Sequence, residues 1–122
     1  MVSFEQGAHG QLLVGEHAQG RIVVRLLGSW DLAMAEMLEE RLCALVRQDR
    51  PRTMALDMVA VDFCDCAVLR VLLGVRAEGQ RVGCEVVISA AAPAVVWLLD
   101  LLGLEGVFGH PPLEPGRGEL SG

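Results

Sequence analysis

The chain has 122 residues, of which 52% are hydrophobic and 21% charged. These values predict one globular domain with a hydrophobic core and argue against a disordered chain. The net charge is −6 without any basic block, so we expect neither a nucleic-acid interface nor an anionic membrane surface as partner. All 10 basic residues are arginine. The lack of lysine excludes a Walker A phosphate loop and a Schiff-base enzyme.

The cysteine pattern argues against a metal site. The chain contains four cysteines, Cys43, Cys64, Cys66 and Cys84. They lack C-x-x-C spacing and lie far in sequence from the histidines, so we expect no metal and interpret them as small core residues. The N-terminus lacks a signal peptide pattern, and the longest apolar stretch, Ala94–Leu104, is too short to span a bilayer. We therefore expect a cytoplasmic protein without membrane insertion or cofactor.

The first half of the chain predicts a hairpin followed by a helix. The segment Met1–Gly10 is polar and contains glycine, which favours a loosely held start. Two strands are predicted at Gln11–Val14 and Arg21–Leu27, joined as a hairpin with a longer loop. The triplet Gly28–Trp30 is expected to break the second strand, and Asp31 is a good N-cap for the next helix.

Helical spacing begins at Leu32 and continues to about Gln48. The apolar stripe of this helix consists of Met34, Ala35, Leu38, Leu42, Leu45 and Val46. The helix is expected to stop before Pro51. A buried strand then follows at Thr53–Met58, which we place inside a mixed sheet.

The centre of the chain, Val59–Leu73, changes from a β-like apolar run to a helix-like run. Asp65 lies at the joint, where its carboxylate can accept a hydrogen bond from the first free N–H groups of the helix. The helix is predicted from Cys66 to about Glu78, ended by Gly79. Such a strand-to-helix elbow is either a packing joint or a docking point.

The last elements are a strand at Gly83–Ser89 and a helix from Pro93 to Leu102. The segment His110–Gly122 is rich in proline and glycine and is predicted to be a disordered tail. The order β-β-α-β-α-β-α predicts a single α/β domain over residues 1–109. Its mixed, mostly parallel sheet would have four or five strands, an N-terminal hairpin and three main helices.

Four local motifs, in this order, resemble the STAS domain of bacterial anti-sigma factor antagonists. They are Gly28-Ser29-Trp30-Asp31, similar to G-x-x-D; Leu56-Asp57-Met58, similar to a strand end; Phe63-Cys64-Asp65 with Leu69, similar to the D-S-S-G-L elbow; and Pro93–Leu104 with Phe108, similar to the closing helix. The resemblance covers roughly Gly20–Phe108. It implies a protein-binding regulatory domain that docks an anti-sigma factor or another ATP-binding regulatory protein.

The elbow departs from the family pattern where phosphorylation occurs. In the family, the second serine of D-S-S-G-L is phosphorylated by the partner kinase. By position, Asp65 matches the aspartate, Cys66 the first serine, Ala67 the phosphoacceptor serine and Val68 the glycine. Because Ala67 has no hydroxyl group, the resemblance implies the fold and the docking function but no phosphorylation at this position.

The resemblance implies a partner-binding surface built from two corners of the chain. One corner is the Gly28–Asp31 motif and the other is the elbow at Asp65. The expected contact residues are Trp30, Asp31, Asp65, Cys66, Ala67, Val68 and Arg70. No catalytic, phosphoacceptor or metal residue is expected, and enzyme activity is not predicted. The rival functions are a degenerate scaffold or accessory subunit of a transporter ATPase, and a small-ligand or redox sensor that uses Cys66.

Three further features keep alternatives open. Asp57, Asp62 and Asp65 could form an acidic Mg²⁺ cluster, although strand-end and capping roles explain them as well. Thr53 and Ser89 are the remaining candidate phosphoacceptors. The third helix is apolar around nearly its whole circumference, which suggests a partner or a homodimer through it. Its apolar residues are Val95, Val96, Trp97, Leu98, Leu99, Leu101 and Leu102.

Overall fold

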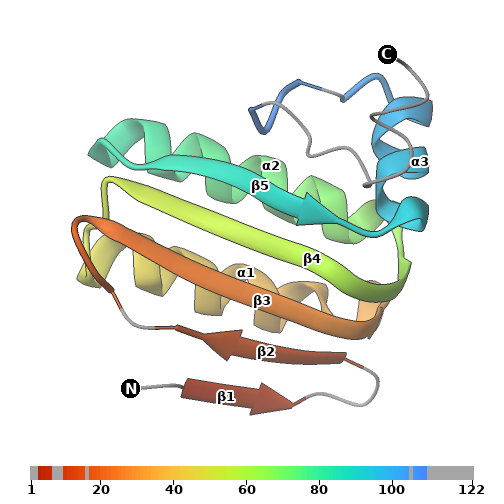
Figure 1. The fold of residues 1–122 in the computed structure, drawn as a ribbon, viewed down its shortest axis with the longest axis horizontal. Coiled ribbons are helices and arrows are strands. Elements are labelled where there is room, and N and C mark those ends of the chain that lie inside the picture. The colour runs from red at the N-terminus through yellow and green to blue at the C-terminus, as the bar shows by residue number, and fades with distance from the viewer. Residues whose placement is uncertain (1–2, 7–9, 16, 105, 110–122) are drawn as a thin grey trace.

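The computed structural model describes residues 3–6, 10–15, 17–104 and 106–109. Its elements are β1 (Ser3–Gln6), β2 (Gly10–Val14), β3 (Arg21–Trp30), α1 (Leu32–Gln48), β4 (Thr53–Cys64), α2 (Cys66–Val82), β5 (Glu85–Ala91) and α3 (Pro93–Leu101). Figure 1 shows them in one α/β unit. The predicted tail, 110–122, lies outside the described residues, so its disorder stays a prediction.

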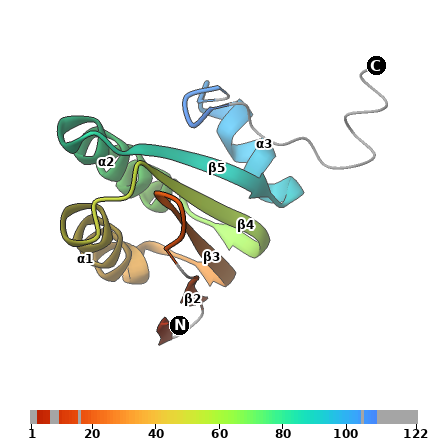
Figure 2. The same cartoon turned by 60° about the vertical axis from the view of Figure 1, so that its left-hand side comes forward.

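The strands form one five-stranded mixed sheet in the order β1-β2-β3-β4-β5. The β1/β2 and β2/β3 pairs are antiparallel, whereas β3/β4 and β4/β5 are parallel. This confirms the predicted fold class, the hairpin and the interior position of Thr53–Met58. Both parallel crossovers run in the same direction, so right-handed connections place α1 and α2 on one face of the sheet, as Figure 2 shows. The third helix lies at the carboxyl end of β5.

The core lies between the sheet and these two helices. All six residues of the predicted α1 stripe are buried, and α2 buries Leu69, Leu72 and Val75 against the sheet side. In β3, the buried residues are Ile22 and Val24, followed by Leu26 at the same two-residue spacing. The helical periodicity in the sequence therefore identified the inward face of α1 correctly.

Several predicted boundaries were wrong. Residues Ser3–Gln6 form β1, where a loose start was predicted. β3 continues through Gly28–Trp30, because Gly28 adopts a φ of +84° and the pairing with β4 shifts register there without ending. α2 continues to Val82, so Gly79 lies inside the helix. Gly28 and Gly79 thus predicted the ends of two elements. The pairing of β3 with β4 and the packing of α2 on β5 keep both glycines inside their elements.

Gly79 is a packing residue and Gly83 is the helix terminator. A Cβ atom on Gly79 would lie 2.6 Å from the Cys84 carbonyl oxygen and 3.0 Å from Val86. Gly83 has a φ of +83° as the C-cap of α2, a left-handed conformation that glycine adopts without strain. The close approach of α2 to β5 is thus the reason for a glycine at position 79.

The C-terminal ends of α1 and α2 are joined by ion pairs around Glu78. Its carboxylate lies 2.9 Å from Arg47 Nε of α1 and 3.1 Å from Arg81 of its own helix. Hydrogen bonds from Arg81 and Arg47 lower the pKa of Glu78 to about 2. Only 13% of the Glu78 side chain is exposed, because its two cationic partners cover it.

A matched pair of glycine substitutions in α2 tests this packing. A Cβ on Gly74 meets only Glu39, at 3.8 Å, so Gly74→Ala should stabilise the protein by about 0.5–1 kcal/mol through helix propensity. Gly79→Ala should instead destabilise it by about 1 kcal/mol or more, because backbone atoms block the added methyl group. Urea denaturation of both variants measures the difference, and equal shifts would contradict the packing role of Gly79.

Candidate functional site

The elbow between β4 and α2 is ordered by one carboxylate. Asp65 is the N-cap residue, with an extended backbone (φ −81°, ψ 152°). Its Oδ1 accepts a hydrogen bond from the Ala67 N–H at 3.0 Å, and its carbonyl accepts one from the Val68 N–H at 3.0 Å. The predicted capping role of Asp65 is confirmed, and its carboxylate satisfies the Ala67 amide at the start of α2.

The second corner, between β3 and α1, has the same construction. Asp31 caps α1, and its Oδ1 accepts a hydrogen bond from the Ala33 N–H at 3.1 Å. The Asp65 N–H donates to the Trp30 carbonyl oxygen at 3.0 Å. This backbone bond joins the two corners, so the starts of α1 and α2 are brought together as the resemblance implied.

Trp30 and Val68 were predicted to contact a partner, and the structure corrects this. Both side chains are 0% exposed, so neither can be touched in this conformation. The Trp30 indole N–H donates to the Leu27 carbonyl at 3.0 Å. A Cβ on Gly10 would lie only 2.7 Å from the indole ring. Trp30 therefore fills the core beneath the corner, where its ring requires a glycine in the neighbouring strand.

The remaining predicted residues reach the surface. Cys66 and Arg70 are exposed, while Asp31, Asp65 and Ala67 are partly exposed. Val68, like Leu69, is buried. The accessible surface of the elbow is thus the first turn of α2 with its capping carboxylate.

Two exposed apolar side chains lie at the same corners and were not predicted. Leu32, the first residue of α1, is 69% exposed, and Phe63, near the end of β4, is 50% exposed. Leu32 lies outside the buried stripe of α1, so the helical periodicity of the sequence already indicated that its side chain is exposed. Phe63 was recognised only as part of a motif, because its exposure depends on how far β4 extends beyond β5. Together these residues give the corners an apolar component that an interface can bury.

The two cysteines of the elbow have opposite environments. Cys64 is buried, and its Sγ lies 3.6 Å from the Asp65 carbonyl oxygen. Burial, with a smaller contribution from the Asp65 carboxylate, raises the pKa of Cys64 to about 12. Cys66 is exposed, and all four thiols are free. Cys64 is therefore an unreactive core residue, whereas Cys66 is accessible to reagents.

The other candidate residues have structural partners. Asp57 pairs with Arg25 at 3.3 Å and accepts a hydrogen bond from the Val59 N–H at 3.2 Å. The Ser89 hydroxyl donates to the Leu56 carbonyl at 3.3 Å. Within residues 3–6, 10–15, 17–104 and 106–109, no three histidine, cysteine or acidic side chains are grouped as a metal site requires. Asp57 thus serves the strand end and Asp65 the cap of α2.

The family model described as the STAS domain matches residues 14–119. The chain belongs to the STAS domain family. A crystal structure of an anti-sigma factor antagonist from Mycobacterium paratuberculosis is 27% identical, with a TM-score of 0.68, over 91% of this chain and 92% of that one. This STAS domain therefore resembles anti-sigma factor antagonists in sequence as well as in fold.

Two more distant structures share the fold. The anti-sigma factor antagonist SpoIIAA in its unphosphorylated form is 18% identical, with a TM-score of 0.70, over 98% of this chain and 96% of that one. A sulfate transporter family protein from Wolinella succinogenes is 15% identical, with a TM-score of 0.61, over 78% and 76% of the two chains. None of the helices in the described part of this STAS domain has the length and apolar character needed to cross a membrane.

The contrast between the cysteines gives a chemical test of the elbow. With Ellman's reagent at pH 8, one thiol should react quickly, and the three buried thiols should react only on unfolding. Burial also raises the pKa of Cys43 and Cys84, and each pKa unit lowers the thiolate fraction about tenfold. Cys66→Ser should abolish the fast reaction. A fast thiol that persists in Cys66→Ser would contradict the assigned burial.

Proposed function

We propose that this STAS domain is a protein-binding regulator of the anti-sigma factor antagonist type. It docks an ATP-binding anti-sigma factor in the cytoplasm through the elbow and the adjoining Gly28–Asp31 corner. The contact residues are Asp31, Asp65, Cys66, Ala67 and Arg70, with Trp30 and Val68 beneath them. Family membership and the 27% identical antagonist support the docking function. The four free thiols support the cytoplasmic location. The protein acts by binding and not by catalysis.

The observation that carries this proposal is the accessible and uncharged first turn of α2. Ala67 is partly exposed, and the family resemblance matches it to the phosphoacceptor serine. The methyl group cannot receive a phosphate, which would add about −1.5 to −2 charges and a hydrated group. Docking by this protein is therefore constitutive at the elbow, and any control acts elsewhere.

The main prediction concerns Ala67→Glu. A carboxylate at this position places charge and bound water in the interface, so partner affinity should fall by at least about tenfold. The fold should remain intact, because a glutamate in the first turn of a helix is favourable with the helix dipole. Isothermal titration calorimetry with the partner and circular dichroism of the variant measure the two effects. Unchanged affinity would move the interface away from the elbow.

Ala67→Ser is the matched control, since it adds only a hydroxyl group. Its affinity should stay within about twofold of the wild type. Incubation of the wild type with the partner and radiolabelled ATP should leave Cys66–Val68 without phosphate. Label on this segment of the wild-type protein would refute the proposed absence of phosphorylation.

The outer face of α3 supports a second candidate function, that of a scaffold or accessory subunit of a transporter ATPase. Trp97 and Leu101, one helical turn apart, are 63% and 62% exposed, and Leu102 is 42% exposed. Capture of partners from the native lysate, followed by mass spectrometry, separates the two functions. An anti-sigma kinase would support the first, and a transporter ATPase the second.

The homodimer through α3 stays a prediction and has its own test. If Trp97 lies in a dimer contact, Trp97→Gln should weaken self-association by about tenfold or more, as expected for a buried aromatic anchor. Leu32→Gln is the control, because Leu32 is similarly exposed but lies at the start of α1. Sedimentation velocity over a range of concentrations measures both. A wild type that sediments as a monomer throughout would exclude the dimer.

A further inference from the structure

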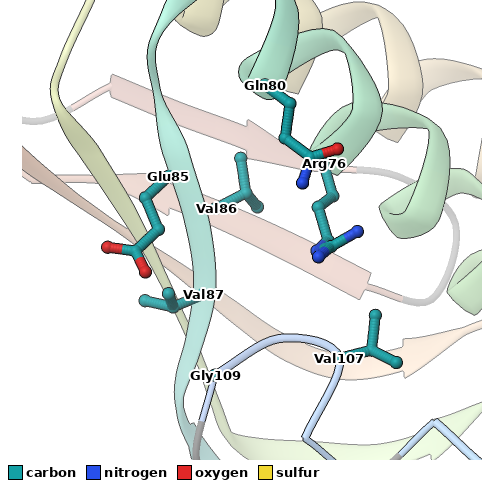
Figure 3. A pocket seen from close by; sticks show the side chains of 7 residues that line it. All are labelled: Arg76, Gln80, Glu85, Val86, Val87, Val107 and Gly109. Carbon is teal, nitrogen blue, oxygen red and sulfur yellow. The ribbon is translucent and has the colours of Figure 1, made fainter.

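The outer edge of β5 borders a small hollow that the elbow does not involve. It has a volume of about 130 Å³ and is lined by Arg76, Gln80, Glu85, Val86, Val87, Val107 and Gly109. Figure 3 shows Arg76 and Gln80 of α2 on one side of the β5 edge, with the 107–109 segment below. Arg76 follows Cys66 by ten positions in the same helix, which separates the hollow from the elbow by about 15 Å along the axis.

The hydrogen bonds of β5 show which backbone groups face this hollow. The Glu85 N–H donates to the Arg52 carbonyl, on the β4 side, at 2.8 Å. The Ile88 N–H donates to the Phe108 carbonyl, on the outer side, at 3.1 Å. Because N–H groups alternate in direction along a strand, the N–H and carbonyl of Val86 point outward into the hollow. The bond to Phe108 shows that a second chain segment can already pair with this edge.

The charge of the hollow is positive on its helix side. Arg76 is partly buried and makes no ion pair or hydrogen bond with any residue in the described part of the chain. In Figure 3, Glu85 points to the other side of β5 from Arg76. An unpaired guanidinium beside outward backbone groups favours a carboxylate that is carried on an extended chain.

The size of the hollow limits what it can hold. Its volume of about 130 Å³ is well below the roughly 300–1,000 Å³ of sites for cofactors and drug-sized ligands. The occupant is therefore a side chain and its backbone, and not a nucleotide or other large cofactor.

We propose that the β5 edge at Val86 binds an extended segment of a partner protein, with an aspartate or glutamate against Arg76. The segment adds as one further strand, bonded to the N–H and carbonyl of Val86 and adjacent to the Phe108 contact. Gln80 borders the carboxylate and can donate to it through its amide. This surface is independent of the elbow, so the two can be occupied at the same time.

The test uses the full chain and two synthetic peptides at millimolar concentration. The probes are acetyl-Thr-Val-Glu-Val-Thr-amide and the same peptide with glutamine in place of glutamate. In ¹⁵N NMR titrations at low salt, the first probe should shift the Val86 amide and Arg76 Nε signals. It should bind about threefold more tightly than the second, as expected for one half-exposed ion pair. Arg76→Gln should remove this difference, and Arg21→Gln, at an exposed arginine of β3, should retain it.

Four outcomes would overturn the proposal. The first is a titration in which Val86 does not shift, and the second is an affinity ratio that Arg76→Gln leaves unchanged. The third is a full-length Glu114→Gln/Glu119→Gln variant that binds the probe several-fold more tightly, which would assign the hollow to the chain's own C-terminal segment. The fourth is Val86 shifts that follow protein concentration without peptide, which would assign the edge to a second copy.

Discussion

The backbone hydrogen bond from the Asp65 N–H to the Trp30 carbonyl is the contact on which the functional end of this domain depends. It is 3.0 Å long and closes the β3/β4 pair just before both strands turn into helices. Beneath it, the fully buried Trp30 requires Gly10 in β2. Two helix starts, each capped by an aspartate, are therefore held side by side by the sheet. A surface built on strand ends and first helical turns is more rigid than one built on loops.

The helix start is suited to docking and poorly suited to chemistry. The Asp65 carboxylate accepts the Ala67 N–H, so a negative charge of the chain itself already lies at the helix start that would otherwise favour an anion. Ala67 offers no nucleophile, and the buried Cys64 has a pKa raised to about 12. What remains accessible is a small uncharged turn flanked by Leu32 and Phe63. Such a surface offers apolar area beside the charged side chains of Asp31, Asp65 and Arg70.

The proposed interaction surfaces lie at separate places on the fold because the mixed sheet has two ends and two edges. The elbow lies at the carboxyl end of β4, whereas the hollow at Val86 lies on the free edge of β5 near its amino end. The outer face of α3 is a third surface, with Trp97 exposed. The docking surface proposed at the elbow and the strand-addition edge proposed at Val86 therefore do not overlap.

Local sequence determined the periodicities and caps of this protein, because they depend on residues three to four positions apart. The α1 stripe and the Asp31 and Asp65 caps followed from it, as did the STAS resemblance. Only the tertiary structure decided where glycine breaks an element and where it packs. Gly28 stays within β3 because β4 pairs with it, and Gly79 stays within α2 because the Cys84 carbonyl lies against it. The burial of Trp30 and the exposure of Phe63 were likewise undetermined by sequence, since both depend on neighbours distant along the chain. In the sequence, Trp30 belongs to a turn-like motif, which favoured a place on the surface. In the fold, β2 packs over its ring, with Gly10 at the point of contact.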